Sequence, residues 1–256
     1  MSGVVGFEVV KGIARIHLNA PEKGNALSDR MVRELTQALT QADQDVHAHA
    51  ILLTGAGENF CSGGDLNDFR AATQKSLDEG YQDIQSSMAL FALGFQLRTP
   101  LVARIQGSVR GGGVGLVAMA HLAVADIHAT FALPEVQLGL FPFGIFPLLA
   151  RALGPRRALE LALSGRVFDV DDAQDYGLVH AASTDSLGVA EDYAHTLASR
   201  SPLALTTGLE AYNHLTDPGS WPLDYLGLLR QLTFKSDTLA TNVQEFLARQ
   251  RQSPQN

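Results

Sequence analysis

The stretch RIQGSVRGGGVGLVAMAHLAVAD, residues 104–126, decides the fold. An apolar segment at 101–107 runs into four glycines within residues 111–115, and a short helical segment through Met119 leads to the strand-like LAVAD at 122–126. Glycine loses more conformational freedom on folding than other residues, so the cluster indicates a turn or a backbone amide that a ligand approaches closely. The order of strand, helix and strand predicts an α/β core with crossover connections.

Two common glycine motifs fit this stretch poorly. Gly113, Gly115 and Ala118 satisfy a dinucleotide-binding spacing, but the next strand begins at Leu122, too soon for the long crossover helix of a dinucleotide fold. A phosphate-binding P-loop needs Lys-Ser or Lys-Thr after the glycines, and neither follows. The remaining functional interpretation is a helix N-terminus whose amide stabilises a developing negative charge. The structural alternative is that the glycines only let a helix pack tightly against a sheet.

The segments before this stretch supply the first half of the core. Residues 7–18 predict two strands around a turn, and Ser28 predicts the N-cap of a helix. The apolar run AILLTGAG at 50–57 predicts a buried strand, and residues 67–98 can be helical. The predicted helix after Ser28 has one apolar face, formed by Met31, Val32, Leu35, Leu39 and Ala42.

Beyond about residue 147 the sequence predicts helix after helix. Pro147, Pro155 and Pro202 stand where helices would begin, and proline fits the first turn of a helix. We therefore expect an α/β core over residues 1–197 and a C-terminal helical region over residues 198–256.

Composition and charge exclude several classes of partner. The chain has 256 residues, of which 46% are hydrophobic and 18% charged, as in an ordinary globular domain. A formal net charge of −8 argues against nucleic-acid and anionic-membrane partners. Cys61 is the single cysteine, no apolar run reaches the length of a membrane span, and the first residues lack signal-peptide features. We expect a cytoplasmic protein.

A second glycine loop, GAGENFCSGGDL at residues 55–66, follows the predicted strand at 50–57. Two strand-to-helix loops that each offer a free backbone amide are what an oxyanion hole needs. Such a hole stabilises a thioester carbonyl as it becomes an enolate.

With both loops in view, the sequence resembles the crotonase, or enoyl-CoA hydratase/isomerase, superfamily over roughly residues 7–250. The matching segments are LNAPEKGNALS, ILLTGAGENFCSGGDL, RIQGSVRGGGVGLVAMAHLAVAD, FALPEVQLGLFP and LALSGRVFDVDDAQDYGLV. The resemblance implies a spiral of β-β-α turns with a C-terminal helical trimerisation region. It also implies an acyl-CoA thioester substrate, no cofactor beyond the coenzyme A of that substrate, and a homotrimer or dimer of trimers. The apolar segment LDYLGLLRQLTF at 223–234 is consistent with such an assembly.

The resemblance also assigns residues to the substrate. It places the two oxyanion amides on Ser62 and Gly112. The wider set of implied substrate-binding residues is Lys23, Ala26, Ser62, Gly63, Gly64, Asp65, Leu66, Gly112, Phe141 and Phe143. Four of these have a purely structural alternative: Lys23 as a solvated surface lysine, Asp65 as a turn residue whose carboxylate caps nearby amides, and Phe141 and Phe143 as core residues.

The acid-base groups separate hydratase from isomerase. Family hydratases use two glutamates; the second corresponds to Glu135, and the first position holds Gly115. One carboxylate suffices to take an α-proton from a 3-enoyl-CoA and return it at the γ-carbon. We therefore predict an enoyl-CoA isomerase with Glu135 as its proton shuttle. The alternatives are a hydratase that uses Glu135 with an unassigned partner, and a non-catalytic acyl-CoA-binding protein. We predict no metal site, and we expect Cys61 to be buried and inert.

Overall fold

The computed structural model describes residues 3–216, 227, 231 and 237–252. Its main sheet has six strands in the order β1-β2-β3-β4-β6-β9. The strands are β1 (Val5–Val10), β2 (Ile13–Leu18), β3 (Ala50–Gly55), β4 (Leu101–Ile105), β6 (Leu122–Asp126) and β9 (Ala181–Ser183). Among the described strands of this main sheet, only β1 and β2 pair antiparallel, through a turn at Lys11 and Gly12, where φ is 51° and 81°. The predicted hairpin and buried strands are confirmed.

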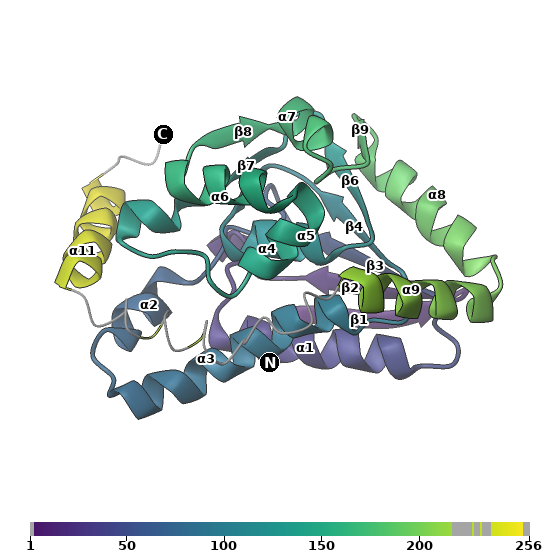
Figure 1. Ribbon diagram of the computed structural model, residues 1–256, viewed down its shortest axis with the longest axis horizontal. Helices are drawn as coiled ribbons and strands as arrows, with labels where there is room; N and C mark the ends of the chain where they lie inside the picture. The colour runs from purple at the N-terminus through teal and green to yellow at the C-terminus, as the bar shows by residue number, and fades with distance from the viewer. Residues whose placement is uncertain (1–2, 217–226, 228–230, 232–236, 253–256) are drawn as a thin grey trace.

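Helices cover both faces of this sheet because its strands are apolar on both sides. Helix α1 (Asp29–Gln44) packs on one face. As predicted, Ser28 is its N-cap: the Ser28 side chain accepts a hydrogen bond from the N–H of Met31 in the first turn. All five apolar positions predicted for this helix are buried. Helix α8 (Ser186–Ala198) covers the opposite face, where Leu52 packs against Ala190 and Ala194. Figure 1 shows α1 and α8 on different sides of the strands.

A smaller sheet, in the order β5-β7-β8, stands beside the main one. Its strands are β5 (Ser108–Arg110), β7 (Thr130–Ala132) and β8 (Val167–Asp169). The chain alternates between the sheets: β4 is followed by β5 and helix α4 (Gly112–Met119), and β6 is followed by β7 and the 3₁₀ turn η3 (Pro134–Leu138). This alternation is the predicted spiral of β-β-α turns.

The remaining described elements are η1 (Pro21–Lys23), α2 (Leu66–Ala72), α3 (Leu77–Ala92), η2 (Leu93–Phe95), α5 (Phe146–Leu153), α6 (Pro155–Ser164), α7 (Val170–Asp175), α9 (Pro202–Thr216) and α11 (Asp237–Gln252). The expectation of helix after helix beyond residue 147 is wrong at two places, because β8 and β9 lie there. Each of these strands has only three residues, too few to show an alternating pattern.

The chain after α8 packs back onto the core. In α9, Asn213 donates from Nδ2 to the carbonyl of Leu97 at 3.1 Å, and in α11 Val243 is completely buried beside Leu140. Apart from Gly227 and Gln231, the segment 223–234 lies outside the described residues, so the predicted assembly stays a prediction. In the described part of the chain, no helix is both long and apolar enough to cross a membrane.

Candidate active site

The two glycine loops are joined by their backbones. The N–H of Arg110 donates to the carbonyl of Cys61 at 3.1 Å, and Cys61 forms a parallel bridge with Val109. At Gly63, where φ is 92°, a Cβ atom would stand 2.7 Å from the carbonyl oxygen of Arg110. Only glycine allows this close approach. The loops therefore form one unit, although about 50 residues of chain separate them.

Gly111 and Gly112 turn the second loop into α4. Gly111 adopts a φ of 48° and its N–H donates to the carbonyl of Ala132 at 2.9 Å. Gly112 is the first residue of the helix, where an N–H has no acceptor within the helix. Within the described residues this N–H donates no hydrogen bond, so it can meet a ligand oxygen.

The first loop offers a different amide from the predicted one. The N–H of Ser62 already donates to the carbonyl of Gly24 at 2.9 Å, and its Oγ donates to the carbonyl of Lys23 at 3.2 Å. Both hydrogen-bond donors of Ser62 are thus bound to carbonyls of residues 23 and 24. The predicted assignment of the Ser62 amide as an oxyanion donor is therefore wrong, because that N–H is already used. The N–H of Gly64 makes no hydrogen bond to any described residue, and Gly64 lines the pocket. Sequence could not show this because the acceptor, Gly24, lies far away along the chain.

Asn25 holds the first loop in place and was not identified from sequence. It is completely buried with a φ of 55°. Its Oδ1 accepts the N–H of Ala20, and its Nδ2 donates to the carbonyls of Ala56 and Asn59, each at 2.9 Å. The only sequence signal is its place in the segment LNAPEKGNALS.

Glu135 lies directly against the second loop. It sits in η3 just after β7, and Oε2 of its half-buried side chain is closed off from solvent. A Cβ atom on Gly111 would come within 2.7 Å of Glu135 Oε1, so the missing side chain at 111 makes room for the carboxylate. The structure thus brings Glu135 to the loop that carries the Gly112 amide, as the sequence predicts.

The position of the first family glutamate is filled by neighbouring side chains. A Cβ atom on Gly115 would collide with Cγ2 of Ile145 and would stand 3.0 Å from the Phe91 ring. Gly115 is itself buried within α4. No carboxylate could point from residue 115 into the pocket without displacing Ile145.

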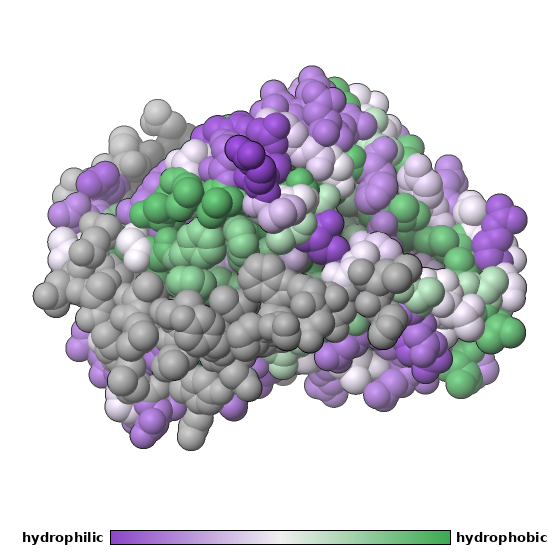
Figure 2. Space-filling view, in the orientation of Figure 1, coloured by the Kyte–Doolittle hydropathy of each residue, from purple (hydrophilic) through white to green (hydrophobic). Residues whose placement is uncertain are grey.

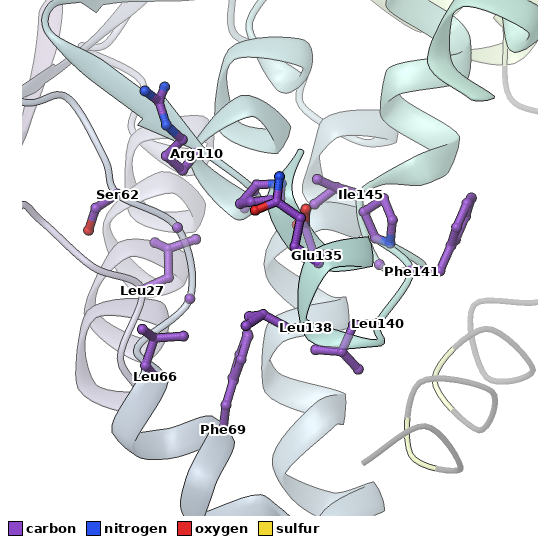
Figure 3. A pocket seen from close by; sticks show the side chains of 18 of the residues that line it. Leu27, Ser62, Leu66, Phe69, Arg110, Glu135, Leu138, Leu140, Phe141 and Ile145 are labelled. Carbon is purple, nitrogen blue, oxygen red and sulfur yellow. The ribbon is translucent and has the colours of Figure 1, made fainter. Parts of the chain in front are cut away.

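The loops and Glu135 open into a pocket of about 460 Å³, within the range of small-molecule sites. Figure 3 shows Glu135 on one side, and Leu27, Ser62 and Leu66 on the other. Most of the lining is apolar, and it includes the predicted residues Leu66, Gly63, Gly64, Phe141 and Phe143. On the face in Figure 2, hydrophobic surface gathers where Figure 1 shows the loop between η3 and α5.

Helix α11 supplies part of the lining that sequence did not predict. Glu245, Phe246 and Arg249 face the pocket, and the carboxylate of Glu245 pairs with Arg249 at 3.2 Å. Both charged side chains remain mostly exposed, at 58% and 79%. No local signal connects this helix to a site built more than 100 residues earlier.

Three predicted coenzyme A contacts lie beside the pocket rather than in its lining. Lys23 Nζ stands 4.0 Å from Asp65 Oδ2, with the lysine side chain 61% exposed. Asp65 caps α2 by accepting the N–H of Asn67 at 2.8 Å, which is the turn role noted as its alternative. Ala26 is half-buried in the same segment as Lys23.

Other reactive groups are accounted for. Burial raises the pKa of the Cys61 thiol to about 12, so it is inert as predicted. Across residues 3–216 and 237–252, no cluster of three His, Cys, Asp or Glu side chains could hold a metal ion.

Known proteins are similar to this chain in sequence and in fold. A family model described as enoyl-CoA hydratase/isomerase matches residues 8–245. The mevalonyl-coenzyme A hydratase of Aspergillus fumigatus is 32% identical over 206 residues, which are 79% of this chain and 75% of that protein. The crystal structure of an enoyl-CoA hydratase from Mycobacterium avium is 28% identical, with a TM-score of 0.85 over 97% of this chain and 98% of that one. That of an enoyl-CoA hydratase from Shewanella pealeana is 26% identical, with a TM-score of 0.81 over 98% and 89%.

Proposed function

Because the chain belongs to the enoyl-CoA hydratase/isomerase family, we propose that it converts 3-enoyl-CoA thioesters to 2-enoyl-CoA thioesters. Glu135 takes a proton from the α-carbon, and the electron pair moves onto the thioester oxygen. The N–H groups of Gly64 and Gly112 donate to that oxygen. Glu135 then returns the proton at the γ-carbon, the double bond forms between the α- and β-carbons, and the carboxylate is regenerated.

One observation favours isomerisation over hydration. Ile145 and Phe91 occupy the space that a carboxylate at residue 115 would need. Adding water across the double bond normally uses one carboxylate for the water and another for the α-proton. With the first position closed, the geometry supports single-base chemistry through Glu135.

The rest of the substrate extends to both sides of this centre. We propose that the acyl chain contacts Phe141 and Phe143, whose rings lie 5.1 Å apart, and that Leu66 contacts the pantetheine. Lys23 contacts Ser62 through its carbonyl and Asp65 through its Nζ, and we propose that Lys23, Ala26 and Asp65 bind the nucleotide end. The reaction needs no cofactor besides the coenzyme A in the substrate. A cytoplasmic homotrimer or dimer of trimers remains our prediction for the assembly.

A hydratase is the second candidate, and one residue favours it. Glu245 of α11 also lines the pocket and could activate water as the partner of Glu135. Its ion pair with Arg249 and its 58% exposure weaken that role, because a solvated, paired carboxylate is a poor match for a proton-transfer base.

The deciding experiment compares two substrates with purified protein. We expect 3-enoyl-CoA to be isomerised faster than 2-enoyl-CoA is hydrated. Faster hydration would assign the hydratase, and the same assay on Glu245→Gln would then identify the partner carboxylate. Binding of acyl-CoA without either reaction would leave only the non-catalytic alternative.

A further inference from the structure

Arg110 is a charged residue at the reacting end that the proposed chemistry does not use. It ends β5, directly before Gly111, and it lines the pocket although its side chain is half-buried. Burial lowers the pKa of its guanidinium below the usual value. In Figure 3 this side chain points away from Glu135, on the side of the pocket where Ser62 lies.

The guanidinium binds the two strands that deliver the reacting groups. Nη1 donates to the carbonyls of Val109 and Thr130 at 2.9 and 2.8 Å. Nη2 donates to Oγ1 of Thr130 at 3.1 Å and to Oγ of Ser108 at 3.4 Å. Strand β5 continues into the Gly112 amide, and β7, which begins at Thr130, continues to Glu135. This side chain therefore reinforces the backbone pairing of β5 with β7, and with it the spacing between the oxyanion loop and the base.

The backbone of the same residue reaches the other glycine loop. Its N–H donates to Cys61, and its carbonyl lies against Gly63. Arg110 thus contacts the neighbours of both free amides as well as the strand that leads to Glu135.

The charge of Arg110 is not balanced by a carboxylate of the described residues. Among the residues that the structure describes, no carboxylate lies within ion-pair distance of its guanidinium. Partial burial of an unopposed cation costs free energy, which hydrogen bonds to neutral oxygens offset only in part. A negative charge that develops on the thioester oxygen would be stabilised by a fixed cation nearby.

We propose that Arg110 is a positioning residue: it locks the Gly112 amide and Glu135 at their working separation and adds positive potential to the oxyanion site. This inference rests on the proposed enolate chemistry. Arginine suits the role because its planar fork satisfies several oxygens at once, which lysine cannot do.

The test replaces Arg110 by Gln and by Lys, with Arg104→Gln as a matched control. Arg104 is also half-buried, on β4, and donates from Nε to Ser186 Oγ at 3.0 Å under α8, away from the pocket lining. We expect Arg110→Gln to lower kcat by about 10- to 100-fold with KM changed less than about 3-fold, because displaced reacting groups lose rate more than binding. Arg110→Lys, which keeps the charge but not the fork, should recover part of kcat. Arg104→Gln should keep wild-type kcat even if its melting temperature falls.

Three results would overturn the proposal: wild-type kcat in folded Arg110→Gln, an equal loss of kcat in Arg104→Gln, or no recovery in Arg110→Lys. If Arg110→Gln does not fold, Thr130→Val decides, since it removes only the Oγ1 acceptor. Unchanged kcat in Thr130→Val would then refute the role, and a lower kcat with unchanged KM would support it. Should the wild type hydrate rather than isomerise, the proposed function fails, and the same variants are measured by hydration.

Discussion

The two ends of the pocket are built in different ways. The reacting end, formed by Gly64, Gly111, Gly112 and Glu135, depends on close approaches at its glycines: a Cβ atom would stand 2.7 Å from Glu135 Oε1 at Gly111 and 2.8 Å from Leu27 Cδ1 at Gly112. The outer wall, formed by Glu245, Phe246 and Arg249 of α11, consists of side chains on one helix. Its charged members are mostly exposed, whereas Oε2 of Glu135 is closed off from solvent.

From this difference we expect the chemistry at one end and the substrate selectivity at the other. Substitutions that remove a reacting group, or move it by more than about 0.5 Å from its working position, should lower the rate strongly. Substitutions on the outer wall change apolar area and charge where we expect the acyl chain to lie, so they should alter substrate preference by modest factors. Four predictions test this division.

The largest effect is expected at Glu135. Glu135→Gln keeps the size of the side chain but removes the base, so isomerisation should fall by about 100-fold or more while acyl-CoA affinity changes little. Glu245→Gln on the outer wall is the control and should retain most of the rate. Steady-state kinetics with 3-enoyl-CoA measures both variants. Equal losses of rate in the two would contradict the assignment of chemistry to the reacting end alone.

The next effect concerns the Gly112 amide. Proline is accepted at the first position of a helix, so Gly112→Pro should fold while losing the donor. Gly112→Ala is the matched control, because its added Cβ meets the same Leu27 side chain at 2.8 Å but leaves the N–H in place. We expect kcat of the proline variant to lie about 100-fold below that of the alanine variant. Similar kcat values would show that this amide does not bind the oxyanion.

Local sequence patterns predicted most helices and strands of the core. They failed where a residue's hydrogen-bond partner lies far away in the sequence. Ser28 and the apolar face of α1 were identified correctly because a cap and a 3.6-residue period are local signals. The Ser62 amide was misassigned because its acceptor, Gly24, is local only in three dimensions. The glycines of both loops and Glu135 could be placed because their motifs are contiguous in sequence, whereas the approach of α11 is set by tertiary packing of residues such as Val243.

The third prediction addresses the outer wall. Phe246 lines the pocket and is 41% exposed, so Phe246→Ala should remove only part of an aromatic contact with the acyl chain. We expect kcat/KM for long-chain substrates to fall by about 3- to 10-fold, with little change for short chains. Gln244→Ala, an exposed neighbour on the same helix, controls for helix destabilisation. An equal loss for short and long chains would place Phe246 at the reacting end instead.

The smallest effect concerns the support of α4 at the end opposite Gly112. There His121 exchanges two hydrogen bonds with β4: its N–H donates to the carbonyl of Leu101, and its Nδ1 accepts the Leu101 N–H, both at 2.9 Å. Burial and the nearby Arg151 charge lower the pKa of His121 to about 4. Protonation would turn the Nδ1 acceptor into a donor facing another N–H, so the folded state needs the neutral ring.

This requirement gives the protein a pH-dependent loss of stability with a defined sign. The unfolded chain protonates His121 near its ordinary value of 6.5, whereas the folded chain does so only near about 4. Between these values the unfolded state binds more protons, so the free energy of unfolding must fall as the pH is lowered. From about pH 7.5 to about pH 5.5 we expect wild type to lose about 1 kcal/mol more than His121→Asn, whose Oδ1 can still accept the Leu101 N–H without titrating. Urea unfolding at the two pH values measures the difference, with exposed His128→Asn as the control. If His121→Asn lost as much stability as wild type, the acid sensitivity would arise elsewhere, and the support of the reacting end would be independent of this histidine.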